Sequence, residues 1–208
     1  LVLGVVIALG VVEGALRIMG KQPYEALYLE TLPREEVLKQ SRFSPHPRYG
    51  YLRKPGVLHI DLPTGYSFTM TIADNGFRIT APPIEAESQP AERPEIWVLG
   101  CSFTLGGFLN DDETFCWLLQ EALPNYKVCN YGMSAYGTVH EYVLLQDLLE
   151  SRKTPDAIIL TYVSFHDFRN QVSRNRSRQI RGFGSIFKQL DARIEKQGRL
   201  QISLKELP

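Results

Sequence analysis

Apolar and polar positions follow two different periods along the second half of the chain. Short apolar runs at 95–100, 126–130 and 156–163 predict strands, and the third is apolar throughout, as in a strand covered on both faces. Between them, residues 111–123 and 138–152 repeat apolar residues at helical spacing. The second helix carries an apolar stripe of Val139, Tyr142, Leu145, Leu148 and Leu149. Strands alternating with helices predict an α/β domain with a parallel sheet over 95–208.

The first half of the chain has a different texture. Residues 44–80 alternate β-forming residues with Gly, Pro and Asn-Gly turn signals, which predicts a small β-hairpin module. Residues 21–43 are charged and mixed, and are interpreted as a stalk. Residues 81–94 are rich in Pro, Ala and Glu, which is typical of a linker. After Phe168 the chain is polar and arginine-rich, and 184–196 is predicted as a helix.

The beginning of the chain is strongly apolar. Residues 1–12 hold no polar side chain, and a helical pattern continues to Gly20. Twenty helical residues would span about 30 Å, so 1–20 is predicted as a transmembrane or signal-anchor helix, with Glu13 and Arg17 paired. A buried core helix and a signal-peptide region are the alternatives. We therefore expect a membrane-anchored protein whose main domain lies outside the cytoplasm, in the periplasm or at the cell surface.

Composition narrows the function classes. The chain has 23 basic and 23 acidic side chains, so its zero net charge gives no argument for a nucleic-acid partner. Three cysteines without metal-ligand spacing predict buried free thiols. The acidic run 110–114 fits a helix start better than a metal site, and neither metal nor cofactor is expected. The arginine-rich run 169–181 is interpreted as a solvated loop, with an anionic substrate or lipid headgroup contact as the alternative.

Polar loops follow each of the three predicted strands. They read GCSFTLG at 100–106, NYGMSAYGT at 130–138 and SFHDFRN at 164–170. Ligands of open parallel sheets bind beyond the carboxyl ends of the strands, so the three loops predict one site. Within the first loop, Ser102 is either a nucleophile or a helix N-cap. His140, in the first turn of the second helix, is interpreted as a surface residue.

These blocks resemble those of the SGNH, or GDSL-type, hydrolases. VLGCSFTLG is similar to the first block, NYGMSAYGT to the second, and SFHDFRN stands where the third usually reads Gly-Asn-Asp. ADNGFRI, at 73–79, resembles a hairpin that often precedes the first block in membrane-anchored members. The resemblance covers about 44–170 and implies a flavodoxin-like three-layer sandwich with a parallel sheet, preceded here by the membrane helix and the hairpin module.

The resemblance implies acyl transfer at the serine. Ser102 would be the nucleophile, with its own backbone N–H as one oxyanion donor. The second backbone donor falls on Ala135, with Gly132 close by. His166 occupies the place of the family's asparagine, where a neutral imidazole donates one hydrogen bond; a base role and a lost activity are the alternatives.

The family's catalytic histidine lies further along the chain, and no histidine follows His166. Because the chain begins at Leu1 inside an apolar run and closes on QISLKELP, where another strand begins, we expect a fragment whose general base lies beyond Pro208. The prediction is an ester hydrolase or acyltransferase acting on an ester-bearing small molecule, glycan or lipid. A catalytically degenerate binding or assembly domain is the alternative. A flavodoxin-like nucleotide binder is weaker, because the first loop lacks Gly-x-Gly-x-x-Gly.

Overall fold

The computed structural model describes residues 2–19, 41–62, 64–82, 93–164, 189–195 and 199–205. Its elements are α1 (Val2–Ile18), β1 (Phe43–His46), β2 (Gly50–Arg53), β3 (Gly56–Asp61), β4 (Ser67–Ile72), β5 (Glu95–Gly100), α4 (Ser102–Leu105), the 3-10 turn η2 (Asp111–Glu113), α5 (Phe115–Ala122), β6 (Lys127–Gly132), α6 (Thr138–Ser151), β7 (Ala157–Leu160), β8 (Gln189–Ile194) and β9 (Leu200–Lys205). The predicted mixed α/β class is confirmed.

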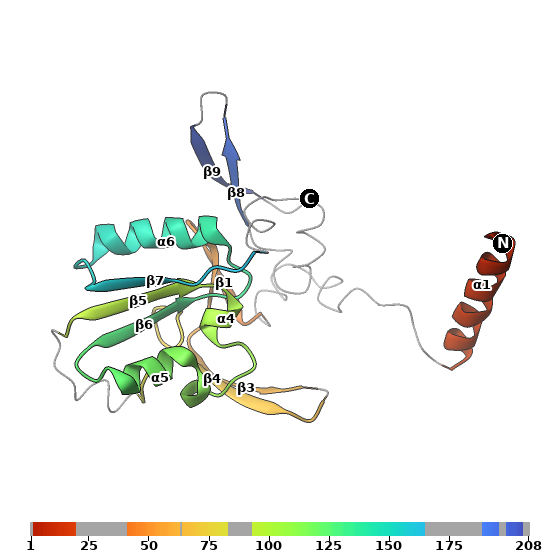
Figure 1. Cartoon of the computed structure of the whole chain (residues 1–208), viewed down its shortest axis with the longest axis horizontal. Helices are drawn as coiled ribbons and strands as arrows, with labels where there is room; N and C mark the ends of the chain where they lie inside the picture. The colour runs from red at the N-terminus through yellow and green to blue at the C-terminus, as the bar shows by residue number, and fades with distance from the viewer. Residues whose placement is uncertain are drawn as a thin grey trace.

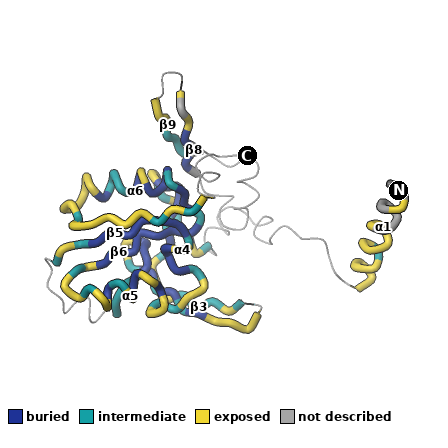
Figure 2. Tube along the Cα trace, in the orientation of Figure 1, coloured by how far each residue is buried: buried dark blue, intermediate teal, exposed yellow. Residues whose placement is uncertain are grey.

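A parallel sheet lies at the centre of the fold. Its order is β6-β5-β7, and both pairings are parallel, as the alternating pattern predicts (Figure 1). Alternate residues of β5 point to opposite faces. Trp97 and Leu99 join a core with α6, whereas Ile96 and Val98 join a core with α5. The sheet is therefore the middle of three layers, and buried positions concentrate along β5 and β6 (Figure 2).

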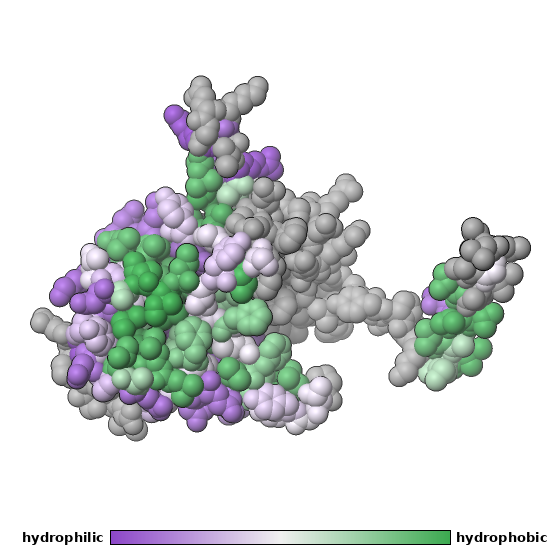
Figure 3. All heavy atoms as spheres, viewed as in Figure 1, coloured by the Kyte–Doolittle hydropathy of each residue, from purple (hydrophilic) through white to green (hydrophobic). Residues whose placement is uncertain are grey.

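Strand β7 differs from the prediction of a strand covered on both faces. It pairs with β5 at one edge of the described sheet, and all four of its residues are exposed. Ile158, Ile159 and Leu160 are exposed apolar residues of β7, and Figure 3 shows apolar side chains gathered on one face of the described domain. The apolar run identifies the strand correctly. It does not identify its position, because an edge strand and a central strand can share one composition.

Helix α6 is rotated relative to the predicted stripe. Val139 and Leu148 are buried as expected, but Tyr142 and Leu149 are 46% and 44% exposed. The interpretation of His140 as a surface residue is wrong, because it is 0% exposed and stacks on Tyr136 with ring centroids 4.6 Å apart. His140 and Glu141 in the first turn are both buried, and His140 packs on the loop after β6.

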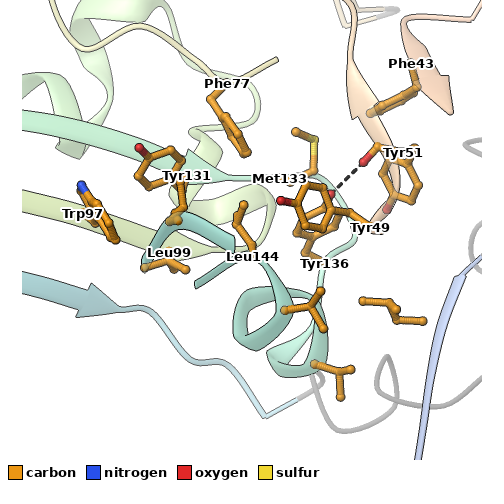
Figure 4. Packing of buried hydrophobic residues seen from close by; sticks show 14 of the residues in the cluster. Phe43, Tyr49, Tyr51, Phe77, Trp97, Leu99, Tyr131, Met133, Tyr136 and Leu144 are labelled. Carbon is orange, nitrogen blue, oxygen red and sulfur yellow. Dashed lines mark hydrogen bonds between the residues drawn. The ribbon is translucent and has the colours of Figure 1, made fainter. Parts of the chain in front are cut away.

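The predicted β-hairpin module contains two antiparallel hairpins, β1–β2 and β3–β4. The first packs into the same core as the sheet, with Phe43, Tyr49 and Tyr51 in one cluster with Trp97 and Tyr131. Figure 4 shows Tyr49 and Tyr51 beside Tyr136 and Met133. The Tyr136 hydroxyl donates to the Tyr51 carbonyl at 2.7 Å. The division of the chain into separate domains stays a prediction.

The predicted helix over 184–196 is wrong where the structure describes it. Gln189–Ile194 is strand β8, which pairs antiparallel with β9, while 184–188 lie outside the described residues. Leu190 and Ala192 are buried, and Arg193 between Ala192 and Ile194 is exposed, so the pattern has the period of two that a strand requires. The strand expected near QISLKELP is confirmed as β9.

Helix α1 has 17 residues. Across the described parts of the chain, no helix combines the length and apolar character needed to cross a membrane, so the predicted transmembrane helix is not supported. The expected pair is present, with Arg17 Nε donating to Glu13 Oε1 at 2.7 Å. The three cysteines are free thiols as predicted, and burial raises the pKa of Cys116 to about 12. The stalk and most of the linker lie outside the described residues.

Candidate active site

Ser102 lies directly beyond the middle strand of the sheet. β5 ends at Gly100, Cys101 is the N-cap, and Ser102 is the first residue of the one-turn helix α4 (Figure 1). The N-cap interpretation of Ser102 is therefore wrong. Its side chain is half-buried, and its hydroxyl has no hydrogen-bond partner among the described residues. A partly accessible hydroxyl that serves no local backbone group is suited to reaction with a ligand.

The loop after β6 is attached to α4 through Asn130. This buried amide donates from Nδ2 to the Thr104 carbonyl at 3.0 Å and accepts the Gly132 N–H at Oδ1 at 2.9 Å. The Met133 N–H donates to the Gly100 carbonyl at 3.0 Å, which extends the pairing beyond the strands. The structure thus brings the first and second predicted loops into direct contact.

Gly132 and Ala135, both proposed from sequence as oxyanion donors, have different environments. The Gly132 N–H is already committed to Asn130, and a Cβ at this position would overlap the backbone of Thr104 and Leu105. Gly132 therefore allows close packing of β6 against α4. Ala135 is half-buried and has a φ of 65°, the left-handed region that favours glycine. The position holds a glycine-like backbone with an alanine side chain.

The end of β7 completes the contacts around α4. The Thr161 hydroxyl lies against the Thr104 hydroxyl and donates to the Leu99 carbonyl at 3.0 Å. A Cβ at Gly100 would overlap both hydroxyl oxygens, so only glycine fits where the three strand ends converge. His166 and all but the first residue of the third loop lie outside the described residues, as does the arginine-rich run.

Arg78, which follows the Asn-Gly turn after β4, was not predicted as a site residue. Its side chain is 0% exposed and forms an ion pair with Asp111 at 2.7 Å. Its guanidinium also donates to four backbone carbonyls, those of Thr69, Leu105, Gly106 and Leu109. Leu105 and Gly106 are the last residue and the C-cap of α4. The only sequence signal was the ADNGFRI segment itself, which indicates a turn but gives no partner for its arginine.

Arg53 contacts the second loop in a similar way. Its Nη2 donates to the Ser134 hydroxyl at 2.8 Å, and the Tyr51 hydroxyl donates to the Ser134 carbonyl at 2.8 Å. Ser134 immediately precedes Ala135. Arg53 is 8% exposed, and burial, followed by the nearby charge of Arg42, lowers its pKa to about 10. Sequence alone could not bring a residue from β2 to a loop eighty residues later.

The acidic run 110–114 has structural contacts. Asn110 Oδ1 accepts the Thr69 N–H at 2.9 Å, and the Asp111 carboxylate accepts the Thr71 N–H at 3.0 Å. Thr114 caps α5 by accepting the Trp117 N–H at 3.3 Å. Within the described ranges, no group of three or more His, Cys, Asp or Glu residues could hold a metal ion.

Comparisons with known proteins give limited overlap. No protein-family model and no curated protein matches the chain. Among solved structures, the chain is similar to the crystal structure of AlinE4, an SGNH-hydrolase family esterase, at 25% identity and a TM-score of 0.33. Two structures of mutants of that esterase match at 25% and 24% identity with the same TM-score. Each match covers 44% of this chain and 50% of the esterase. The chain thus spans about half the length of the esterase, and the activity of the whole protein is a matter for proposal.

Proposed function

We propose that this chain carries the nucleophile of an SGNH-type serine ester hydrolase or acyltransferase. The observation that carries the proposal is the placement of Ser102: a half-buried serine at the carboxyl end of the middle strand, not used as a cap, with the loop from β6 docked on its helix. Ligands of open parallel sheets bind at this same edge, beyond the carboxyl ends of the strands. The resemblance of the three sequence blocks supports the acyl-transfer chemistry.

In the proposed reaction, the Ser102 hydroxyl oxygen attacks an ester carbonyl while a general base takes its proton. The carbonyl π electrons move to oxygen, and the backbone N–H groups of Ser102 and Ala135 stabilise the resulting oxyanion. Collapse of the tetrahedral intermediate breaks the ester C–O bond and releases the alcohol. Water, or an acceptor alcohol in a transferase, then removes the acyl group from Ser102.

The third donor lies outside the described residues. His166 is proposed as that donor in place of the family's asparagine, and a histidine is proposed as the general base, as the family resemblance implies. The substrate class, an ester-bearing small molecule, glycan or lipid, belongs to the proposal. The membrane-anchored location outside the cytoplasm stays a prediction from the apolar sequence at 1–12.

Covalent labelling tests the proposal directly. The full-length protein is treated with a fluorophosphonate probe, and the labelled peptide is identified by mass spectrometry. Label on Ser102, lost in Ser102→Ala, is the expected result, and Ser151→Ala serves as a control for an exposed hydroxyl at the end of α6, away from the site. A protein that never labels, or labels equally after Ser102→Ala, contradicts the proposal. The absence of label would favour the alternative of a degenerate binding domain, which the replacement of asparagine by His166 motivates.

A further inference from the structure

We propose that Arg78 and Arg53 are positioning residues for the site, each reaching from the hairpin region to one of the two site loops. The inference rests on the proposed function and deepens it, because it identifies what fixes the nucleophile and the second oxyanion donor. Arg78 contacts the end of α4, and Arg53 contacts the residue before Ala135. Neither side chain touches the reacting atoms, so each would act through the loop it holds.

Helix α4 depends on outside support for its conformation. It has one turn, and an isolated turn does not repay the cost of fixing its dihedral angles. The last carbonyls of a helix lack intrahelical partners. Arg78 Nη1 supplies a donor to two of them, at 3.1 Å to Leu105 and 2.6 Å to Gly106. The orientation of Ser102, one turn away, therefore follows from these bonds.

The remaining donors of Arg78 connect this turn to fixed structure. Nη2 donates to the Thr69 carbonyl at 3.0 Å in β4 and to the Leu109 carbonyl at 2.7 Å. Nε donates to Asp111 Oδ1 at 2.7 Å, and that carboxylate also accepts the Thr71 N–H. One planar guanidinium thus joins β4, the α4 turn and η2. A lysine ammonium has three donors and no planar fork, so it cannot reproduce all five bonds.

Arg53 contacts the second loop without the acidic partner that Arg78 has. It forms no ion pair with any carboxylate in the described part of the chain, and its Nε is buried without a hydrogen-bond partner there. Its other close contact is a cation–π interaction, with its guanidinium carbon 4.8 Å from the centre of the Phe43 ring. A buried charge without an acidic partner lowers the stability of the folded state. We therefore infer that the bond from Arg53 to Ser134 is present because it fixes the conformation of the loop.

Arg78 and Arg53 can affect the reaction rate at Ser102 because an oxyanion site depends on preorganised donors. An oxyanion site works because its donors are already aimed before the charge develops. A displacement of about 1 Å caused by a change away from the chemistry can slow a reaction by about 100-fold. We therefore expect Arg78→Lys and Arg53→Lys each to slow fluorophosphonate labelling of Ser102 by about 10- to 100-fold.

Arg93 offers a matched control. Its Nη1 donates to the Pro124 and Tyr126 carbonyls at 3.1 and 2.8 Å, beside the amino end of β5 and away from the site. Labelling rates and thermal midpoints are measured for the three lysine variants of the full-length protein. Slow labelling in the Arg78 and Arg53 variants, with the parental rate in Arg93→Lys, supports the proposal. Parental rates in both site variants, or equal slowing in the Arg93 variant, overturn it.

Hydrogen exchange by mass spectrometry separates positioning from catalysis. Arg78→Lys should speed exchange in peptides covering 101–109, and Arg53→Lys in those covering 133–137, with β5 unchanged. Unchanged exchange in these peptides overturns the positioning role, whatever the labelling rate. If the parent protein never labels, the proposed function is refuted. If the two lysine variants nevertheless show these local changes in exchange, the positioning contacts are supported. If Arg78→Lys fails to fold, Asp111→Asn loosens Arg78 more mildly, and parental labelling and exchange in that variant also overturn the Arg78 part.

Discussion

Replacing Ala135 by glycine should leave the protein at least as stable as the parent. Ala135 has a φ of 65°, and an L-residue in this left-handed region costs about 1–2 kcal/mol. Glycine removes that strain but adds about 0.5–1 kcal/mol of chain entropy lost on folding. Ala135 is half-buried, so loss of its methyl removes only part of the roughly 0.8 kcal/mol assigned to a fully buried group. The expected balance is a gain of up to about 1 kcal/mol.

Urea denaturation measures this balance, with the midpoint and slope compared between variants. Ala122→Gly is the matched control, because Ala122 is exposed and lies in the right-handed helix α5. That change relieves no strain and should destabilise the protein by about 0.5–1 kcal/mol. If Ala135→Gly loses as much stability as Ala122→Gly, then the left-handed conformation is not strained in solution and the reasoning fails.

Two further predictions concern stability and pH. Asn130→Ala and Gln120→Ala should each destabilise the protein by about 1–3 kcal/mol, because each change leaves buried backbone groups unpaired. Only Asn130→Ala should slow fluorophosphonate labelling, since Gln120 bridges the turn between α5 and β6, away from Ser102. Burial lowers the pKa of His46 below its ordinary value of 6.5, so the unfolded state binds the proton first and stability falls as pH drops below about 6.5. Urea midpoints of His46→Gln should therefore decline less than those of the parent between neutral pH and about pH 5.

Each of these predictions has a clear contrary result. Equal slowing of labelling in the Asn130 and Gln120 variants would show that the effect comes from general loosening of the fold. A parental pH profile in His46→Gln would show that proton binding at this ring does not matter. The Nδ1 atom of His46 accepts the Arg48 and Tyr49 N–H groups, both at 3.3 Å, so protonation there would remove both acceptors.

Local pattern was enough to locate the strands of the parallel sheet and the loop that carries Ser102. The run 95–100 coincides with β5, and β6, α6 and β7 begin within one residue of their predicted starts. Pattern failed where tertiary contacts decide. His140 is buried with its ring stacked on Tyr136, which packs on Tyr51 of β2, and β8 is a strand that pairs with β9. The periodicity of a single element reports neither of these contacts.

The candidate site shows the same division between local and long-range information. Ser102 could be proposed from the sequence because its loop follows a predicted strand, and Ala135 because the family resemblance implies a backbone donor there. Arg78 and Arg53 were not found, because the residues of the site loops that they contact lie 27 to 81 residues away in sequence. The difference between Gly132 and Ala135 also needed the structure, which shows the Gly132 N–H bonded to Asn130 and a left-handed backbone at Ala135.

The core shared by the first hairpin and the sheet has a consequence for cooperativity. Phe43, Tyr49 and Tyr51 bury their rings in the same cluster as Trp97 and Tyr131, and aromatic side chains contribute strongly to such a cluster. Because the two regions share one core, we expect hairpin and sheet to unfold in a single transition. A shortened protein starting at the apparent boundary before Glu95 would remove part of its own hydrophobic core. The boundary that composition draws in the sequence is not a boundary of stability.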